Sequence, residues 1–512
     1  MKRGIAALFC FIYVLSLFSG CNGEKQPYIP TGNGLYQEDT HPSTTPAVSD
    51  QEQKLTLAYD PTQSLNPYQT GSHTNKLLFS LIYQPLFSVD ENYTAHPILC
   101  KQYRISGDMK TYTFYPEAAT FSDGSVLTAQ DVAASLLYAK DSPVYAGRFG
   151  ALADVQVTQD GGVAVTMQIP YENLPLLLDV PIVPAEQVSA QQPLGTGPYW
   201  LEENASGFWL QRRSDWWCRA DMPVTASYIL LTAAQTTTEL RDAFEFGNTG
   251  LVCADLGSDT YVDFRGDYEL WDCESGYFLY LSCNEKSTVF SKAAVRKALT
   301  HAIDRDALVT QFYHDFAFSA ELPASPKSPF YDQKLAANYS YDPTLFHQAV
   351  EQAQLTGSSI TLLVNQADGR RVRVAKAIGQ MLESAGLSVT VSALSGESYT
   401  NALTKGKYDL HLGQTKLSAN MDLSAFFSPT GALNFGGLED AVCYSLCQEA
   451  MGNIGNYYSL HRVVMDSGML CPILFRSYAL YAARGVFDRL DPARDHIFFY
   501  TLGKNLAAIR LP

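Results

Sequence analysis

The residue types that perform catalysis are present in this sequence, but not at the spacings that catalysis or metal binding requires. There is no His-Glu-x-x-His, no Gly-x-x-x-x-Gly-Lys and no Gly-x-Ser-x-Gly, and the nine histidines are scattered. Cys443 and Cys447 stand one helical turn apart and could supply half of a metal site, but no second pair with ligand spacing lies nearby. The pattern disfavours an enzyme and predicts buried thiols, without a metal or a cofactor.

The beginning of the chain has the three-part form of a secretory signal over residues 1–20. A basic Met1-Lys2-Arg3 precedes an apolar run, and Ser19-Gly20 leads into Cys21. This ending resembles a bacterial lipoprotein signal, in which the cysteine is acylated and becomes the new N-terminus. Acyl chains on Cys21 would hold the protein on a membrane. An ordinary cleaved signal and an N-terminal anchor helix are the alternatives.

The chain as a whole is acidic, with 36 Lys and Arg against 52 Asp and Glu and a formal charge of −16. This balance excludes the basic face that nucleic-acid binding needs. Residues 21–53 are rich in Pro, Thr, Ser and Gly and have no apolar period, so we predict a flexible tether. No second apolar run has the length of a membrane span, so the body is expected in water beside the membrane.

Hydrophobic periodicity predicts a mixed α/β body. Strands are indicated over 360–364 and 387–391, with a helix over 371–384 between them. This is a βαβ unit, so its strands are expected to be parallel, with a right-handed crossover. Further strands and helices alternate through about 290–475.

Two helix starts are predicted from capping patterns. Thr128 and Asp131 form a capping box, in which each side chain accepts from the other residue's backbone N–H. Ser291 is expected to cap a helix that continues through Leu308.

Several ordered segments together resemble the family-5 extracellular solute-binding proteins of ABC importers, the oligopeptide-, dipeptide- and nickel-binding lipoproteins. The resemblance covers about 55–490, nearly the whole mature chain. The segments that carry it are Leu65-Asn66-Pro67-Tyr68, Thr111-Tyr-Thr-Phe114, Phe121-Ser-Asp-Gly124, Leu127-Thr-Ala-Gln-Asp-Val132, Gly195-Thr-Gly-Pro-Tyr199, Leu279 to Asn284, Val295-Arg-Lys-Ala-Leu299, Ala302-Ile-Asp-Arg305 and Lys405-Gly-Lys-Tyr-Asp409.

This resemblance implies an α/β, two-lobed clamp like that of the periplasmic binding proteins (type II, cluster C), with an inserted sub-domain. The implied function is that of a monomeric, lipid-anchored, extracytoplasmic receptor, at the cell surface or in the periplasm. It would capture a peptide or another small solute and deliver it to ABC permease subunits. A cell-surface hydrolase with an unrecognised carboxylate pair, and a ligand-binding sensor without transport, remain as alternatives.

The resemblance also implies a division of the chain and two hinge crossings, near Leu281–Asn284 and Ile473–Tyr478. The expected units are lobe I over 54–74, 190–284 and 475–512, an inserted sub-domain over 75–189, and lobe II over 285–474.

Ligand contacts are expected where the resemblance places the cleft. The loop after the first strand contributes Leu65, Asn66 and Tyr68, unless this is a plain Pro turn. Asn365 follows a strand of the wound lobe, at the sheet edge where such folds bind ligands, or it is an exposed loop residue.

The hinge strands offer alternating residues to the same cleft. Either Tyr277 and Leu279 or Phe278 and Tyr280 could line it, and the other pair would pack in the core. Tyr478, at the second crossing, is a further candidate.

The segment 413–422 bears on the ligand's charge. In the peptide-binding proteins that this chain resembles, the segment contains Gly-Trp followed by an acid that pairs with the peptide ammonium. Here Gln414 takes the position of the Trp, and the position of the acid falls near Lys416. A cleft-facing Lys416 favours a carboxylate, phosphate or sugar acid. A cleft-facing Asp422 favours an amine, unless that side chain caps a helix; Lys416 could also be a solvated surface residue.

Overall fold

The computed structural model describes residues 54–69, 72–204, 207–224, 226–258, 263–487, 490 and 492–494. The expected signal, Cys21 and the expected tether lie outside the described residues. Within the described part, no helix is both long and apolar enough to pass through a membrane.

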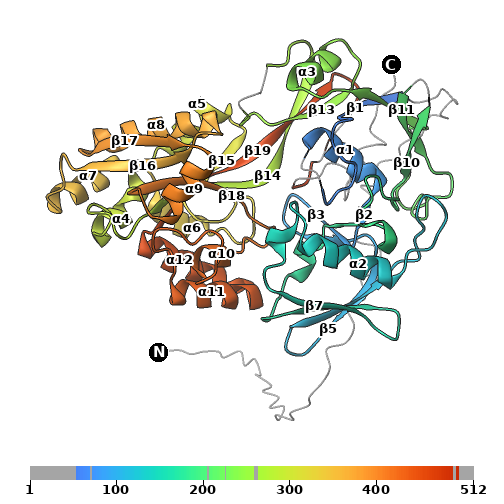
Figure 1. The fold of residues 1–512 in the computed structure, drawn as a ribbon, viewed down its shortest axis with the longest axis horizontal. Coiled ribbons are helices and arrows are strands. Elements are labelled where there is room, and N and C mark those ends of the chain that lie inside the picture. Colours follow the sequence, from blue (N-terminus) through green and yellow to red (C-terminus); the bar gives the residue numbers. More distant parts are fainter. Residues whose placement is uncertain are drawn as a thin grey trace, which may run out of the picture.

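One mixed sheet runs through the molecule, with the long antiparallel strands β14 and β19 at its centre (Figure 1). Five strands continue from β19 on one side and three from β14 on the other, and β15 pairs with β19. In sheet order the strands are β10 (Tyr199–Asn204), β11 (Gly207–Arg212), β12 (Tyr228–Ala233), β1 (Lys54–Tyr59), β13 (Leu251–Ala254), β19 (Leu470–Ala483), β14 (Tyr268–Cys283), β18 (Leu410–Lys416), β16 (Ser359–Asn365) and β17 (Ser388–Leu394), with β15 at Ala317–Ser319.

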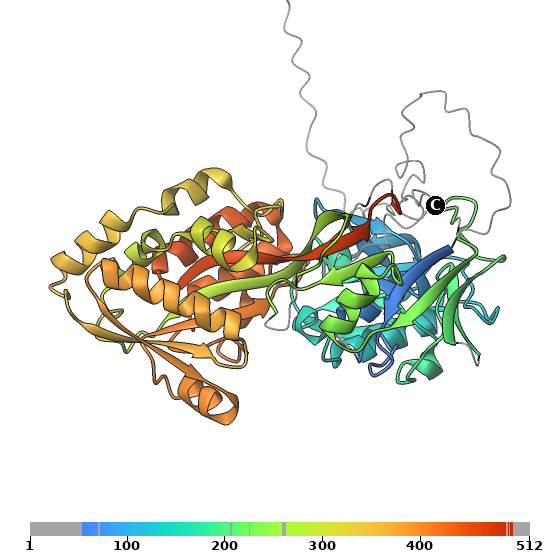
Figure 2. The ribbon, with the colours of Figure 1, turned by 90° about the horizontal axis from the view of Figure 1, so that it is seen from above.

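β14 and β19 connect two lobes, as both views show (Figures 1 and 2). Lobe I holds β1 and β10 to β13 with α1 (His73–Ile82) and α3 (Thr237–Glu245). Lobe II holds β15 to β18 and α4 to α12. Its helices are α4 (Ala293–Ala298), α5 (Arg305–Tyr313), α6 (Gln333–Ala336), α7 (Pro343–Gln352), α8 (Gly369–Ser384), α9 (Gly396–Thr404), α10 (Ser424–Phe427), α11 (Ala441–Gly452) and α12 (Tyr457–Ser467).

A sub-domain between α1 and β10 packs below lobe I in Figure 1. Its four-stranded antiparallel sheet has the order β5-β6-β8-β7, and α2 (Ala129–Lys140) packs against it. The strands are β5 (Cys100–Ile105), β6 (Thr111–Pro116), β8 (Val163–Met167) and β7 (Leu152–Val157), and two short pairs join β2 (Gln84–Pro85) to β9 (Pro181–Ile182) and β3 (Phe87–Val89) to β4 (Ala95–Pro97).

The βαβ unit and the capping box are confirmed. β16 and β17 are parallel, with Leu362 opposite Val391, and α8 lies between them in sequence. Asp131 accepts from the backbone N–H of Thr128 at 2.8 Å, and the Thr128 hydroxyl accepts in return. Cys443 and Cys447 are buried free thiols.

The helix predicted from Ser291 through Leu308 is wrong. α4 begins at Ala293, and Ile303 is extended before α5 begins. Asp304 caps the new helix by accepting from Ala307 N–H at 3.0 Å. Arg305 is buried and donates to backbone carbonyls outside the helix. These two polar side chains outweigh the apolar periodicity that predicted one helix.

Candidate functional site

The central strand pair is interrupted by a bulge in β14. The strand pairs with one half of β19 up to Glu274 and with the other half from Phe278 onward. Between them, Gly276 has φ +75°, in the left-handed region that glycine enters without a steric penalty. The bulge places Tyr277 opposite Lys416, at the end of β18. Residues of both lobes therefore meet at this point.

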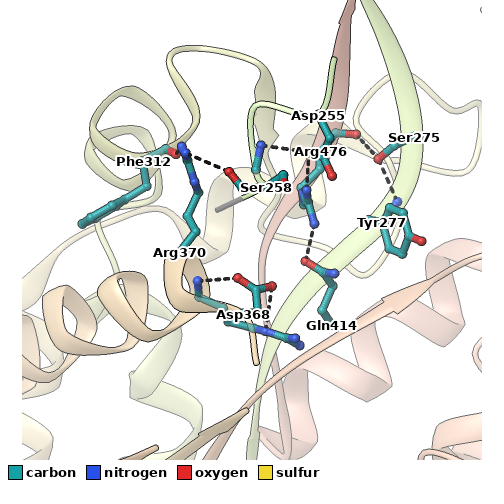
Figure 3. Close-up of polar contacts among 11 residues, drawn as sticks. Asp255, Ser258, Ser275, Tyr277, Phe312, Asp368, Arg370, Gln414 and Arg476 are labelled. Carbon is teal, nitrogen blue, oxygen red and sulfur yellow. Dashed lines mark hydrogen bonds and ion pairs between the residues drawn. The ribbon is translucent and has the colours of Figure 1, made fainter. Parts of the chain in front are cut away.

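Arg476, on β19, connects the lobes beside the bulge (Figure 3). It forms an ion pair with Asp255, in the lobe I loop after β13, and donates to Oε1 of Gln414 on β18 at 3.0 Å. Its guanidinium carbon lies 5.4 Å from the ring centroid of Tyr277. Burial alone would lower the pKa of Arg476, but the Asp255 carboxylate raises that pKa above its usual value, so the side chain stays charged.

A cavity of about 370 Å³ lies between the lobes next to this junction. Its walls come from the start of α1, from the short 3-10 helix Ala146–Arg148 of the sub-domain, from Tyr277, from the end of β18 and from Arg494. Among the described residues that line it there is no Asp or Glu. The basic lining residues are His73, Lys76, Arg148, Lys416 and Arg494.

Three of the residues predicted from the sequence come together here. Tyr277 and Lys416 line the cavity, and the Lys416 ammonium nitrogen lies 5.8 Å from the Tyr277 ring centroid. Gln414 lies two residues before Lys416, on the same face of β18, and accepts a hydrogen bond from Arg476.

The predicted loop residues Leu65, Asn66 and Tyr68 are buried away from this cavity. The Asn66 amide donates to the carbonyl oxygens of Val188 and Ala190, and the Tyr68 hydroxyl donates to that of Pro181. These contacts attach the loop to the sub-domain, and Gln69, the last described residue of the loop, reaches the cavity wall.

The two remaining hinge tyrosines are also buried. Tyr280 is 2% exposed, and its ring packs edge-on against Phe426 at 5.0 Å, on the opposite face of β14 from Tyr277. Tyr478 is 3% exposed, and its ring centroid lies 4.3 Å from that of His73. Tyr478 therefore packs against His73, which lines the cavity.

Asn365 and Asp422 serve local turns. Asn365 ends β16, and its side chain accepts from Ala367 N–H at 2.9 Å. Asp422 accepts from Ser424 N–H at 2.8 Å at the start of α10, and burial raises the pKa of its carboxyl. Neither residue lines the cavity.

Sequence reasoning missed the other basic residues of the wall. Arg494 lies 77 positions from Leu417, to whose carbonyl oxygen it donates, and His73 and Lys76 belong to a helix with no distinctive motif. Only the folded chain brings these charges together, so no local pattern signals them.

Two other cavities fit a role in solute capture less well. One of about 780 Å³ lies between α7 and α8, but all of its lining residues belong to lobe II. Another, of about 310 Å³, lies between the sub-domain and lobe II near Glu172 and Ile454, and none of its described lining residues belongs to β14, β18 or β19. In the part of the chain that the structure describes, no group of three or more His, Cys, Asp or Glu side chains could hold a metal ion.

Comparison with known proteins identifies the relationship. Residues 94–434 match the model of the middle region of the bacterial extracellular solute-binding proteins, family 5. The glutathione-binding protein GsiB of Escherichia coli K12 is 24% identical over 384 residues, which cover 72% of this chain and 73% of GsiB.

Two solved structures share the fold. NikA from Brucella suis, in complex with Fe(III)-EDTA, superposes with a TM-score of 0.70 at 21% identity and covers 87% of this chain and 99% of its own. The putative peptide-binding protein AppA from Clostridium difficile superposes with a TM-score of 0.73 at 14% identity and covers 90% and 100%. The two-lobed clamp predicted from the sequence is thereby confirmed.

Proposed function

Because the chain belongs to family 5 of the bacterial extracellular solute-binding proteins, we propose that it is the lipid-anchored receptor of an ABC importer. It captures a small solute between lobe I and lobe II on the outer side of a membrane and delivers it to the permease. The observation that carries this proposal is the cavity beside the β14 bulge, whose walls come from both lobes.

A cavity of this kind couples binding to closure. A ligand shifts an open–closed equilibrium only by the difference between its affinities for the two states. A solute that touches α1 on one side and the end of β18 on the other makes its full set of contacts only when the lobes are together. A permease that recognises the closed form would then distinguish the loaded receptor from the empty one.

We also propose the division of the chain that the resemblance implies, with lobe I at 54–74, 190–284 and 475–512, the sub-domain at 75–189 and lobe II at 285–474. One adjustment follows from packing: α1 contacts β1, β10 and β13, so we assign the whole helix to lobe I and begin the sub-domain after it. The register shift of β14 against β19 between Glu274 and Phe278 supports a hinge close to the first crossing.

Relatives bind small ligands of more than one kind. GsiB is named for glutathione, and NikA was solved with an iron chelate. We propose a peptide-like or other small solute for this chain, with Tyr277 and Lys416 in direct contact and Gln414 acting through Arg476.

Native mass spectrometry of the gently purified full chain tests solute capture. We expect a mass excess that disappears when the chain is denatured, and the released molecule identifies the solute. The same mass under native and denaturing conditions, together with no affinity for any solute in a broad screen, would contradict the proposal.

Membrane anchoring is tested separately on Cys21. Cys21→Ser should prevent acylation and release the protein from the membrane fraction, while Cys10→Ser, within the expected signal, should leave it anchored. If both variants sediment with membranes, the anchor is not a lipid on Cys21.

A further inference from the structure

The cavity between the lobes has a positively charged lining. Lys76 comes from α1, Arg148 from the sub-domain, Lys416 from β18 and Arg494 from the segment after β19. Arg148 forms an ion pair with Asp179, whose side chain is fully buried. The described part of the lining contains no acidic side chain, so an anion placed in the cavity meets cations from four segments of the chain.

Arg494 has unused hydrogen-bonding capacity at this wall. The residue is 2% exposed, and its Nη2 donates to the carbonyl oxygen of Leu417. Its Nε and Nη1 are buried, and no group in the described structure accepts a hydrogen bond from them. Buried donors without an acceptor are costly, and a charged N–H group of a guanidinium forms strong hydrogen bonds to the oxygens of an acid group. A bound carboxylate or phosphate would supply the acceptors that the described part of the chain does not.

The position of Arg494 is set by the hinge. A Cβ atom added at Gly276 would lie 2.5 Å from Nη2 of Arg494, so the guanidinium packs directly on the bulge of β14. The carbonyl of Leu417, just past β18, holds it from the lobe II side. An anion on Arg494 is therefore bound at the point where the two lobes join.

The same cavity is poorly suited to an extended peptide held by its ammonium group. Its volume of about 370 Å³ is at the lower end of the usual range for ligand sites, roughly 300–1,000 Å³. Asp422, the acid nearest in sequence to Lys416, accepts from Ser424 and does not line the cavity.

We propose that this cavity selects a small solute with two or more acid groups, one of which is bound by Arg494 and another by Lys416 or Lys76. The inference rests on the proposed solute-binding function and specifies the class of solute. The acid groups are carboxylates or phosphates, which share the anionic oxygens that guanidinium and ammonium groups recognise.

Calorimetric titration of the full chain at constant ionic strength tests this selection. The probes are glutarate, 1,3-propanediol bisphosphate, the uncharged glutaramide and the cation 1,5-diaminopentane, after any co-purified solute has been removed by reversible unfolding. We expect at least one diacidic probe to bind roughly tenfold or more tightly than glutaramide, and the diamine not to bind. A preference for glutarate indicates carboxylates, and a preference for the bisphosphate indicates phosphates. Equal binding of the acids and glutaramide overturns the proposal.

Four substitutions test which residues are responsible for the preference for acidic probes. Arg494→Gln and Lys416→Gln should each weaken the acidic probe roughly tenfold to a hundredfold, the range expected for losing a charged hydrogen bond. Arg494→Lys keeps the charge but loses the planar set of N–H donors. Its affinity for the acidic probe should lie between that of Arg494→Gln and that of the unchanged protein. Lys297→Gln removes an exposed charge from α4, outside the cavity, and should leave the affinity unchanged. If Lys297→Gln weakens binding as much as Lys416→Gln, the preference reflects overall charge and the proposal fails.

The solute released in the mass spectrometry experiment separates the two proposals. A released molecule with two acid groups supports both. A released molecule that is neutral or carries only amines overturns the acidic selectivity and leaves the receptor function standing. A chain that releases nothing and binds none of the probes contradicts the acidic selectivity, and its failure to bind any other solute would contradict the receptor function.

Discussion

Arg476, on the second hinge strand, forms an ion pair with Asp255 in the loop that follows β13. The two side chains are only 7% and 18% exposed, and the same guanidinium reaches Gln414 in lobe II. The pair is therefore a polar contact inside the junction, where a lost partner leaves a charge with little access to water.

Replacing Arg476 with Met should destabilise the fold by about 3 kcal/mol, because Asp255 would remain poorly hydrated without its cation. Urea unfolding followed by tryptophan fluorescence measures the change. The variant should also weaken solute binding, since Gln414 loses the contact that ties β18 to the hinge.

Arg484→Met is the matched control. Arg484 follows the last residue of β19 and pairs with Asp267, where the side chains are 58% and 72% exposed. Such surface pairs contribute less than about 1 kcal/mol. Equal losses in the two variants would show that the Arg476 pair has no special role.

Glu172 should stabilise the closed arrangement by joining the sub-domain to lobe II. Its carboxylate accepts from Ile454 N–H of lobe II at 2.7 Å, and its own N–H donates to the Met451 carbonyl at 2.7 Å. Glu172→Ala removes only the first contact. We expect a two- to tenfold loss of solute affinity, corresponding to about 0.5–1.5 kcal/mol.

Small-angle scattering of the unliganded protein checks the cause. The Glu172→Ala variant should have a larger radius of gyration than the unchanged protein, whereas Glu186→Ala, at an exposed position of the same sub-domain, should not. A weaker affinity with an unchanged radius would assign Glu172 to the ligand and not to closure.

A glycine on β18 leaves space for a core tyrosine. A Cβ atom at Gly413 would lie 2.4 Å from Cζ of Tyr280. Gly413→Ala should therefore cost about 1–3 kcal/mol through overpacking. Gly150→Ala, where a Cβ would meet nothing within 4 Å, should change the free energy of unfolding by less than about 0.5 kcal/mol. Similar losses in both variants in urea unfolding would contradict this packing.

The sequence was most informative where structure is local. The βαβ unit around α8 follows from periodicity, and the capping box of Thr128 and Asp131 follows from a three-residue spacing. The prediction at Ser291 failed because Asp304 and the buried Arg305 satisfy their hydrogen bonds outside a continuous helix. Periodicity does not register such contacts.

The candidate site was only partly predictable for the same reason. Lys416 and Tyr277 belong to segments that the resemblance singled out, and strand register brings them together. Arg494 is held at the site by its hydrogen bond to the Leu417 carbonyl, and its guanidinium occupies the space that the missing side chain of Gly276 leaves. Strand alternation offered two faces of β14, and only the bulge decides that Tyr277 reaches the cavity while Tyr280 enters the core.

Two buried histidines should make the fold sensitive to acid. Burial lowers the pKa of both His411 and His461 from about 6.5 to about 3. Above pH 6.5 both are neutral in the folded and unfolded chains. As the pH falls from 6.5 towards 3, only the unfolded chain takes up these protons, so stability falls by about 1.4 kcal/mol per pH unit for each histidine.

His461→Phe should reduce this sensitivity. Neither ring nitrogen of His461 has a hydrogen-bond partner in the described structure, and the ring packs edge-on against Tyr457. Phenylalanine fills a similar volume without buried polar atoms, so stability at pH 7.5 should be equal or higher. Between pH 6 and 4 the advantage of the variant should grow by about 1.4 kcal/mol per pH unit, because one proton-binding group is gone from the unfolded chain. Urea midpoints at half-unit pH steps measure the difference. Curves that stay parallel from pH 8 to 4 would mean that His461 is already protonated in the folded protein or hydrated there.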